Sequence, residues 1–144
     1  MKKIFIAFAC VIALVTTACA DNYKPISHDQ LPEKAQAFIS TYFPDSKVSL
    51  VRKETDVMEL SYDVIFTDGS KVEFDSKGNW TEVDCLTRSV PAGIVPEAIS
   101  KVINEYYPNV QAIKIERDQR EIDVKLSNRV ELTFNNQYKL IDID

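Results

Sequence analysis

The stretch Leu31–Pro44, with the sequence LPEKAQAFISTYFP, recurs 64 positions later as Val95–Pro108, with the sequence VPEAISKVINEYYP. Each copy has a proline followed by a glutamate near its start. This pair suits the first turn of a helix, because proline needs no hydrogen-bond partner there and a carboxylate favours the positive end of the helix dipole. Apolar residues then recur at the spacing of one helical face, and a closing proline stops the helix. The sequence therefore predicts two short helices, each with one buried face.

Each predicted helix is followed by four runs of alternating apolar and polar residues, which is typical of strands with one buried face. Asp68-Gly69, between the second and third runs, is a strong signal for a hairpin turn. Equivalent strand positions are 60 residues apart, four fewer than the helices, so the second set should have a shorter first hairpin. The eight predicted strands are 47–54, 57–66, 71–75, 79–84, 110–117, 120–127, 129–134 and 138–144.

We therefore predict an α+β fold built from a tandem repeat of a helix and a four-stranded antiparallel meander. The first repeat covers 31–84 and the second 95–144, with a connector at 85–94 and an irregular lead-in at 21–30. Helix and sheet must bury their apolar sides against each other. Both helices should therefore cover one face of the sheet and leave the other face open to solvent, as antiparallel sheets allow.

Residues 1–20 have the features of a secretory signal peptide, namely a basic start, an apolar run and a tail of small residues. Ala18-Cys19-Ala20 fits the A-x-A pattern of simple cleavage, which would leave Asp21 at the new N-terminus. Alternatively, Cys19 is the lipidated first residue of a bacterial lipoprotein, although Thr16 stands where leucine is usual. We expect a periplasmic or secreted protein, with a membrane anchor only if Cys19 is lipidated.

The chain after residue 20 is acidic. Two of the 17 basic residues precede that position, so the remainder carries 15 basic and 22 acidic side chains, a net charge of −7. Nucleic-acid binding needs a basic face and is not expected. The single Cys85 of this part cannot form an internal disulfide. We expect it to be a small buried residue near a strand end, with an intermolecular disulfide or a reactive thiol as the alternatives.

The sequence contains no recognisable catalytic pattern. His28, in the polar lead-in, is the only histidine, so a common zinc site lacks ligands. There is no G-x-S-x-G motif, and Gly69, Gly78 and Gly93 do not form a glycine-rich phosphate loop. We predict no catalytic residue, no cofactor and no enzymatic activity.

Strand alternation assigns candidate binding residues to the open face of the sheet. An outward tryptophan beside an isoleucine is typical of a protein-binding sheet. In the alternative, Trp80 closes the sheet edge over the core, because a single β-bulge would reverse its side. The candidate residues for binding a protein or peptide partner are Asp63, Ile65, Glu73, Trp80, Lys125 and Leu140.

A second possibility is a small ligand or a metal ion. Glu82 with Asp84, and Asp142 with Asp144, form carboxylate pairs at equivalent strand ends, and carboxylates are ligands that Ca²⁺ prefers. Neither pair has the spacing of an EF-hand. We therefore keep a metal-ion or small-ligand binder as the alternative and assign no metal-ligating residue.

The order of four segments, QLPEKAQAFISTYFP, TDGSKVEFDSKGNWTEVDC, IVPEAISKVINEYYP and LSNRVELTF, resembles the PepSY-like family over essentially the whole mature chain. This family of small exported bacterial proteins is described as β-lactamase-inhibitor-like and is best represented among Bacteroides-type bacteria. The resemblance implies tandem helix-plus-four-strand repeats, a broad curved sheet with helices on its convex side, and an envelope setting. It implies no reaction. We therefore expect a binding protein for a protein or peptide of the envelope, with an inhibitor-like role as one form.

Overall fold

The computed structural model describes residues 22–144. The predicted signal peptide, with its cleavage site and Cys19, lies outside these residues and stays a prediction. Within residues 22–144, no helix is long and apolar enough to span a membrane.

Two helices form where the repeated stretch predicts them. Helix α1 is Glu33–Tyr42 and helix α2 is Glu97–Tyr106, and each begins directly after a proline at the N-cap. Both end in the same way, because the residue after the helix donates its N–H to the carbonyl of an isoleucine in the last turn. Each helix buries two side chains, Ala35 and Ile39 in α1 and Ile99 and Ile103 in α2.

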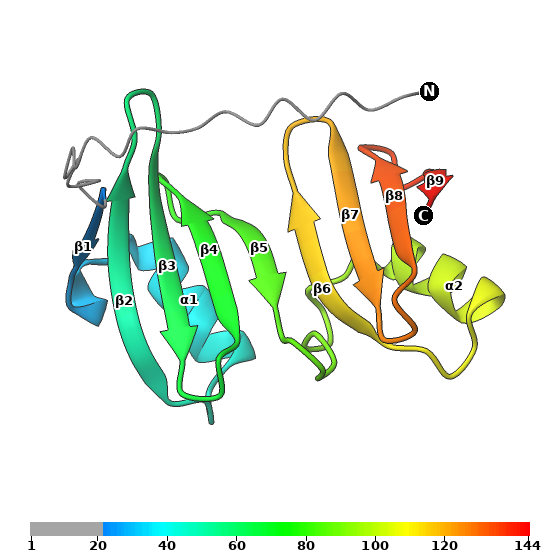
Figure 1. The fold of residues 1–144 in the computed structure, drawn as a ribbon, viewed down its shortest axis with the longest axis horizontal. Coiled ribbons are helices and arrows are strands. Elements are labelled where there is room, and N and C mark those ends of the chain that lie inside the picture. The colour runs from blue at the N-terminus through cyan, green and yellow to red at the C-terminus, as the bar shows by residue number, and fades with distance from the viewer. Residues whose placement is uncertain (1–21) are drawn as a thin grey trace, which may run out of the picture.

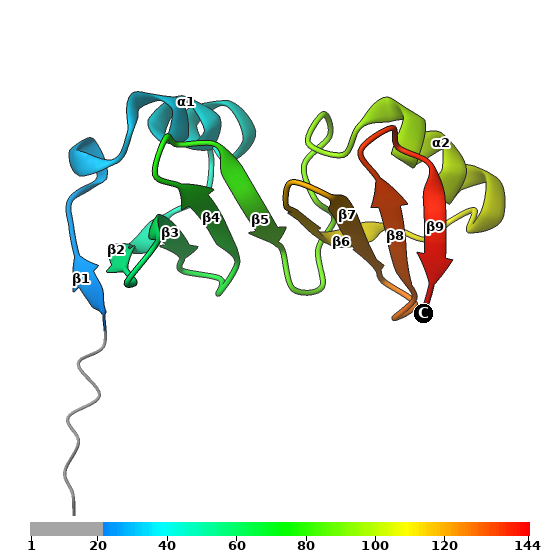
Figure 2. The same ribbon diagram turned by 90° about the horizontal axis from the view of Figure 1, so that it is seen from above.

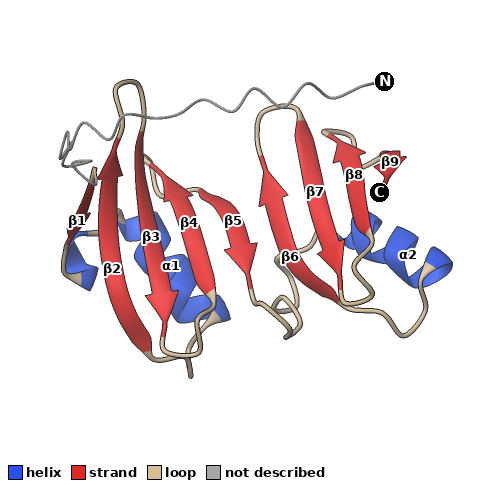
Figure 3. Ribbon diagram, viewed as in Figure 1, coloured by secondary structure: helices blue, strands red, loops and turns tan. Residues whose placement is uncertain are grey.

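The strands of residues 22–144 form a single nine-stranded sheet in which each strand pairs antiparallel with the next along the chain (Figures 1 and 3). Helix α1 precedes β2 to β5, and α2 precedes β6 to β9. The strands are β1 (Tyr23–Pro25), β2 (Val48–Thr55), β3 (Leu60–Phe66), β4 (Lys71–Asp75), β5 (Trp80–Asp84), β6 (Ala112–Arg117), β7 (Glu121–Leu126), β8 (Glu131–Asn135) and β9 (Leu140–Ile143).

The lead-in is more ordered than the sequence predicts. It contains β1, which adds a ninth strand to the edge of the sheet, and a short 3-10 helix, η1 (His28–Gln30). Tyr23 pairs with Glu54, and the Arg52 guanidinium carbon lies 3.9 Å from the centre of the Tyr23 ring. Backbone pairing and this stacking hold β1 against β2. The sequence of β1 is polar and does not alternate between apolar and polar residues, so it could not be recognised as a strand.

Both helices lie on the same face of the sheet, as the amphipathic pattern predicts (Figure 2). The core fills the space between them and the sheet, and it combines helix residues with alternate residues of the central strands. Cys85 is part of this core. The largest fully buried apolar side chains are Phe66, Phe74, Phe134, Ile99, Ile115, Leu126, Leu132, Val64, Val72, Val83 and Val124.

The predicted difference between the two first hairpins is confirmed. Strands β2 and β3 have 8 and 7 residues, whereas the equivalent β6 and β7 have 6 each. The turn between the first pair covers 56–59 and that between the second pair covers 118–120. The β2–β3 hairpin therefore extends beyond its counterpart at the same end of the sheet (Figure 1).

Candidate functional site

Carboxylates from five consecutive strands lie side by side on the face of the sheet that the helices leave open. The cross-strand pairs are Asp63 with Glu73, Glu73 with Glu82, Glu82 with Glu116, and Glu116 with Asp123. We call these five residues the acidic row. Like charges directly opposite each other destabilise a sheet, so this arrangement has a cost in folding free energy.

Two lysines from the adjacent positions offset part of this charge. The Lys71 Nζ lies 3.6 Å from a Glu73 oxygen and 3.2 Å from a Glu82 oxygen. The Lys114 Nζ lies 3.5 Å from Glu82 and 3.7 Å from Glu116. Because each lysine is shared between two carboxylates, this part of the open face keeps an excess of negative charge.

Asp63 is the most buried member of the acidic row, with 2% of its surface exposed. Its Oδ2 accepts a hydrogen bond from Arg52 Nε at 2.7 Å, and its Oδ1 has no hydrogen-bond partner among the described residues. Burial raises the pKa of the neighbouring Glu73, and the charge of Asp63 raises it further, whereas Lys71 acts in the opposite direction. The negative charges of Asp63 and Glu73 are therefore unfavourable here, because the two side chains are partly or fully buried and repel each other.

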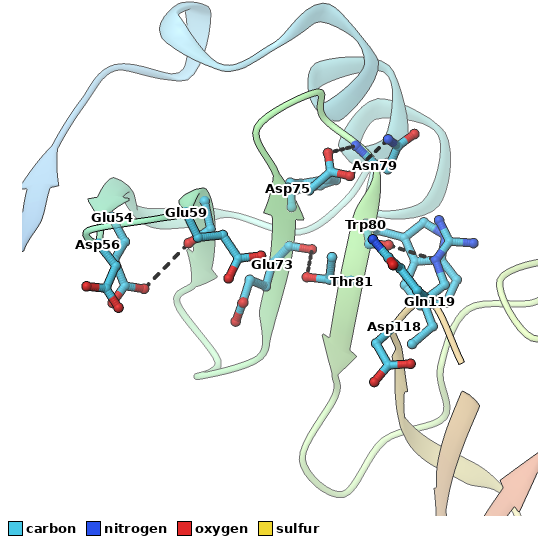
Figure 4. A pocket seen from close by; sticks show the side chains of 13 residues that line it. Glu54, Asp56, Glu59, Glu73, Asp75, Asn79, Trp80, Thr81, Asp118 and Gln119 are labelled. Atoms are coloured by element: carbon cyan, nitrogen blue, oxygen red, sulfur yellow. Dashed lines mark hydrogen bonds between the residues drawn. The ribbon is translucent and has the colours of Figure 1, made fainter. Parts of the chain in front are cut away.

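A hollow of about 490 Å³ lies at the end of the open face where the β2–β3 hairpin, the β4–β5 turn and the β6–β7 turn come together (Figure 4). Trp80 contributes apolar surface to its wall, and Arg117 is its one cationic lining residue. We call it the acidic hollow because six carboxylates line it: Glu54, Asp56, Glu59, Glu73, Asp75 and Asp118.

Arg117 is already engaged within the protein. Its Nε donates to the Trp80 carbonyl at 2.8 Å, and its guanidinium carbon lies 3.8 Å from the centre of the Trp80 ring. Burial lowers the pKa of Arg117. Glu73 lies 3.6 Å from the Lys71 Nζ, but the other five carboxylates of the hollow form no ion pair among the described residues. They are therefore available to a cationic group.

The prediction that Trp80 lies on the open face is wrong. Glu73 pairs with Glu82 but Phe74 pairs with Trp80, so Thr81 is an extra residue in β5. This β-bulge puts Trp80 on the side of buried Phe74, where its ring centre lies 6.3 Å from that of Phe38 in α1. The alternative interpretation is correct in placing Trp80 over the core, although β5 is the central strand of the sheet and not an edge.

The placement of Leu140 on the open face is wrong for the same reason. Thr133 pairs with Asp142 and Phe134 pairs with Leu140, which indicates an equivalent irregularity in β9. Leu140 therefore packs against the core from the helix side. A bulge leaves no trace in the alternation of so short a strand, so the sequence could not show it.

The other four candidates lie on the open face but do not form one cluster. Asp63 and Glu73 are direct cross-strand neighbours, and half-buried Ile65 lies opposite Lys71 in the same half. Lys125 belongs to β7, where its Nζ is 3.7 Å from Glu131. Sequence reasoning missed most of the hollow, because its residues come from three turns far apart in the chain. Whether any candidate binds a partner stays a prediction.

The remaining polar candidates have local roles. Asp84 accepts the Leu86 N–H and lies opposite Lys114. Within residues 22–144, no group of three or more histidine, cysteine or acidic side chains is arranged to hold a metal ion. Cys85 is buried, as expected, and burial raises the pKa of its thiol to about 11. His28 is exposed at the start of η1.

Comparison with known proteins gives a consistent picture. The sequence model of a family described as "Putative beta-lactamase-inhibitor-like, PepSY-like" matches residues 17–60 and 60–142. These two segments together cover most of the chain. No curated protein sequence matches the chain significantly.

Solved structures of Bacteroides proteins share the fold. A "putative calcium-regulated periplasmic protein" from Bacteroides thetaiotaomicron is 54% identical with a TM-score of 0.85, over 87% of this chain and 98% of that chain. A "putative periplasmic protein" from Bacteroides vulgatus is 53% identical with a TM-score of 0.84, over the same shares of the two chains. Another from Bacteroides vulgatus, described as of unknown function, is 33% identical with a TM-score of 0.81, over 85% and 98%.

Proposed function

The chain belongs to the PepSY-like family, and from this premise we propose that it is a non-enzymatic, exported binding protein of the cell envelope. Its open sheet face would hold a protein or peptide partner. The solved relatives are described as periplasmic proteins, which supports the same location for this chain. Neither the family description nor the relatives name a reaction, and inhibition of an envelope protein is one form that such binding takes.

The observation that carries this proposal is the acidic row on the uncovered face. Arg52, Lys71 and Lys114 offset only part of the charge of these five facing carboxylates. The like charges that remain opposite each other weaken the sheet. A partner with positive charge would relieve this repulsion on binding. Complementary charge of this kind speeds association and selects the partner.

Site-specific photo-cross-linking in the periplasm tests the proposal. A photoreactive amino acid replaces Ile65 on the open face or, as the control, Tyr106, which is 63% exposed on α2. We expect a defined protein or peptide adduct from position 65 only. The adduct should disappear when Glu73→Lys reverses one charge of the acidic row. Equal adducts from both positions, or none from position 65, would contradict the proposal.

Calcium is a second candidate ligand, because one relative of 54% identity is described as a "putative calcium-regulated periplasmic protein". The acidic hollow offers carboxylate oxygens of the kind that Ca²⁺ prefers, although side chains would have to move together to coordinate it. Titration calorimetry with CaCl₂, and with MgCl₂ as the control, tests this. Binding at about 1 mM or tighter that Glu73→Gln with Asp118→Asn weakens would support a calcium site. Unchanged heats and melting temperature would exclude one.

A further inference from the structure

The tip of the β2–β3 hairpin carries the two most exposed large apolar side chains of residues 22–144. Val57 and Met58 are each 96% exposed, whereas the next, Tyr106, is 63% exposed. Removing apolar side chains of this kind from water normally lowers the free energy. Two adjacent ones at the end of a projecting hairpin therefore form a contact surface that has no partner within this part of the chain.

The tip is a closed turn that holds these side chains outward. The Asp56 N–H donates to the Glu59 carbonyl at 2.9 Å, and the Asp56 side chain accepts the Val57 N–H at 2.7 Å. Strand pairing continues to Thr55 and Leu60, directly beside the turn. The turn thus depends on the backbone and on Asp56, and it does not need the side chains of Val57 and Met58.

The corresponding turn of the second half lacks this feature. Its residues are Asp118, Gln119 and Arg120, and Asp118 accepts the N–H groups of Arg120 and Glu121. The backbone bond that closes the turn is preserved, from the Asp118 N–H to the Glu121 carbonyl at 3.1 Å, without any apolar residue. The longer hairpin and its two apolar side chains belong to the first half alone.

The apolar tip stands directly beside the acidic hollow. Asp56 and Glu59, which flank Val57 and Met58, both line the hollow, and Glu54 lines it one step further along β2. Figure 4 shows these three carboxylates together on one side of the hollow, with Asp118 on the other. Negative charge around the tip disfavours the anionic surface of a membrane and favours a cationic partner.

We propose that the β2–β3 hairpin tip and the acidic hollow form one docking surface for a protein segment that places a lysine or arginine in the hollow. An apolar side chain of the same segment covers Val57 and Met58. This inference rests on the proposed function. It adds which part of the open face makes the contact and what chemistry the partner has. The cationic group meets the hollow's carboxylates, and the tip supplies apolar contact area.

A displayed library of random peptides is the probe that tests the inference. Peptides are selected on the wild-type protein, and their affinities are then measured for Val57→Ser with Met58→Ser and for Glu59→Lys. Ile141→Ser, an exposed apolar position on the distant β9, is the matched control. Because Val57 and Met58 are almost fully exposed, the double variant should keep the circular dichroism spectrum and melting temperature of the wild type.

We expect selected peptides to carry lysine or arginine next to a large apolar residue. Their affinity should fall about tenfold or more in both tip variants, fall with added salt, and stay unchanged in Ile141→Ser. Selection of no peptide, or of peptides that bind both tip variants normally, would overturn the inference. Binding of the wild type to vesicles of phosphatidylethanolamine and phosphatidylglycerol, lost in the double variant, would make the tip a membrane contact instead.

The two proposals fail in different ways. An adduct from position 65, combined with peptides that bind both tip variants normally, would contradict the docking surface at the hairpin tip. It would still support a binding protein that uses the open face. Loss of both signals would remove the two proposals together.

Discussion

Arg117 of β6 stacks on Trp80 of β5, with its guanidinium carbon 3.8 Å from the centre of the indole ring. The same side chain donates to the Trp80 carbonyl at 2.8 Å. Strands β5 and β6 join the first half of the sheet to the second, through three residue pairs between Glu82–Asp84 and Lys114–Glu116. The Arg117–Trp80 contact extends this short junction, and Trp80 connects it to α1 through Phe38.

Replacement of Arg117 should therefore weaken the whole sheet. We expect Arg117→Ala to lower the free energy of unfolding by about 2 kcal/mol, from the lost cation–π contact and the charged hydrogen bond. The free energy of unfolding of Arg117→Lys should lie between those of Arg117→Ala and the wild type, because an ammonium group does not reproduce the fixed geometry of the guanidinium. Urea unfolding measures both. Arg120→Ala in the neighbouring turn is the control, and an equal effect there would contradict the structural role of Arg117.

The Arg52–Asp63 pair predicts an asymmetric response to mutation. The Asp63 side chain is 3% exposed and that of Arg52 is 27% exposed. Arg52→Ala leaves a buried carboxylate next to Glu73, and we expect it to cost about 3 kcal/mol. Asp63→Asn leaves an arginine that can still reach water, and we expect a cost of about 1 kcal/mol. Chemical unfolding of the two variants checks the order, and the reverse order would show that Asp63 is solvated in solution.

Local sequence signals predicted the regular elements well and the candidate site only in part. The two proline-glutamate helix starts and the strand alternation are contained in short windows, so α1, α2 and β2 to β9 could be predicted. The side that Trp80 faces depends on one extra residue, Thr81, whose Oγ1 donates to the Glu73 carbonyl at 3.3 Å. The wall of the hollow likewise depends on the contact between Arg117 and Trp80, which are 37 residues apart in the sequence. Long-range contacts of this kind leave no periodic pattern.

Glu73 should make stability depend on pH. Burial, followed by the charge of Asp63, raises its pKa above the ordinary value of 4.5. A carboxyl group whose pKa is higher in the folded state favours folding while it is protonated, and this contribution is lost as the pH rises through the folded-state pKa. Glu73→Gln removes the titration. Its melting temperature relative to the wild type should therefore be highest near neutral pH and should decrease as the pH falls through the carboxylate range.

Thermal unfolding at several pH values measures this difference. Lys71 keeps Glu82 as a partner at 3.2 Å in the variant, so the loss of its longer contact to Glu73 should not mask the trend. Glu105→Gln, at an exposed position of α2, controls for the change in net charge. A difference between wild type and Glu73→Gln that is constant with pH would show that the pKa of Glu73 is not raised.

Two turns in the first half use glycine at a positive φ angle, Gly69 at 88° and Gly78 at 86°. The equivalent residues of the second half are Arg129 and Tyr138, with φ angles of 74° and 61°. A side chain is thus tolerated at this backbone conformation in this fold. Any further sensitivity at the two glycines must come from the space around them.

That space differs sharply between the two positions. A Cβ atom on Gly78 would lie 2.8 Å from Pro32 Cβ and 3.0 Å from Ala35 N, at the rigid start of α1, whereas one on Gly69 would lie 3.2 Å from the flexible Leu86 side chain. We expect Gly69→Ala to cost about 1 kcal/mol from the φ angle alone, and Gly78→Ala to cost about 3 kcal/mol because the turn must also move away from α1. Urea unfolding of the two variants gives this difference directly. Equal costs would mean that the β4–β5 turn is not packed on the helix, and that the wall of the acidic hollow formed by this turn can move.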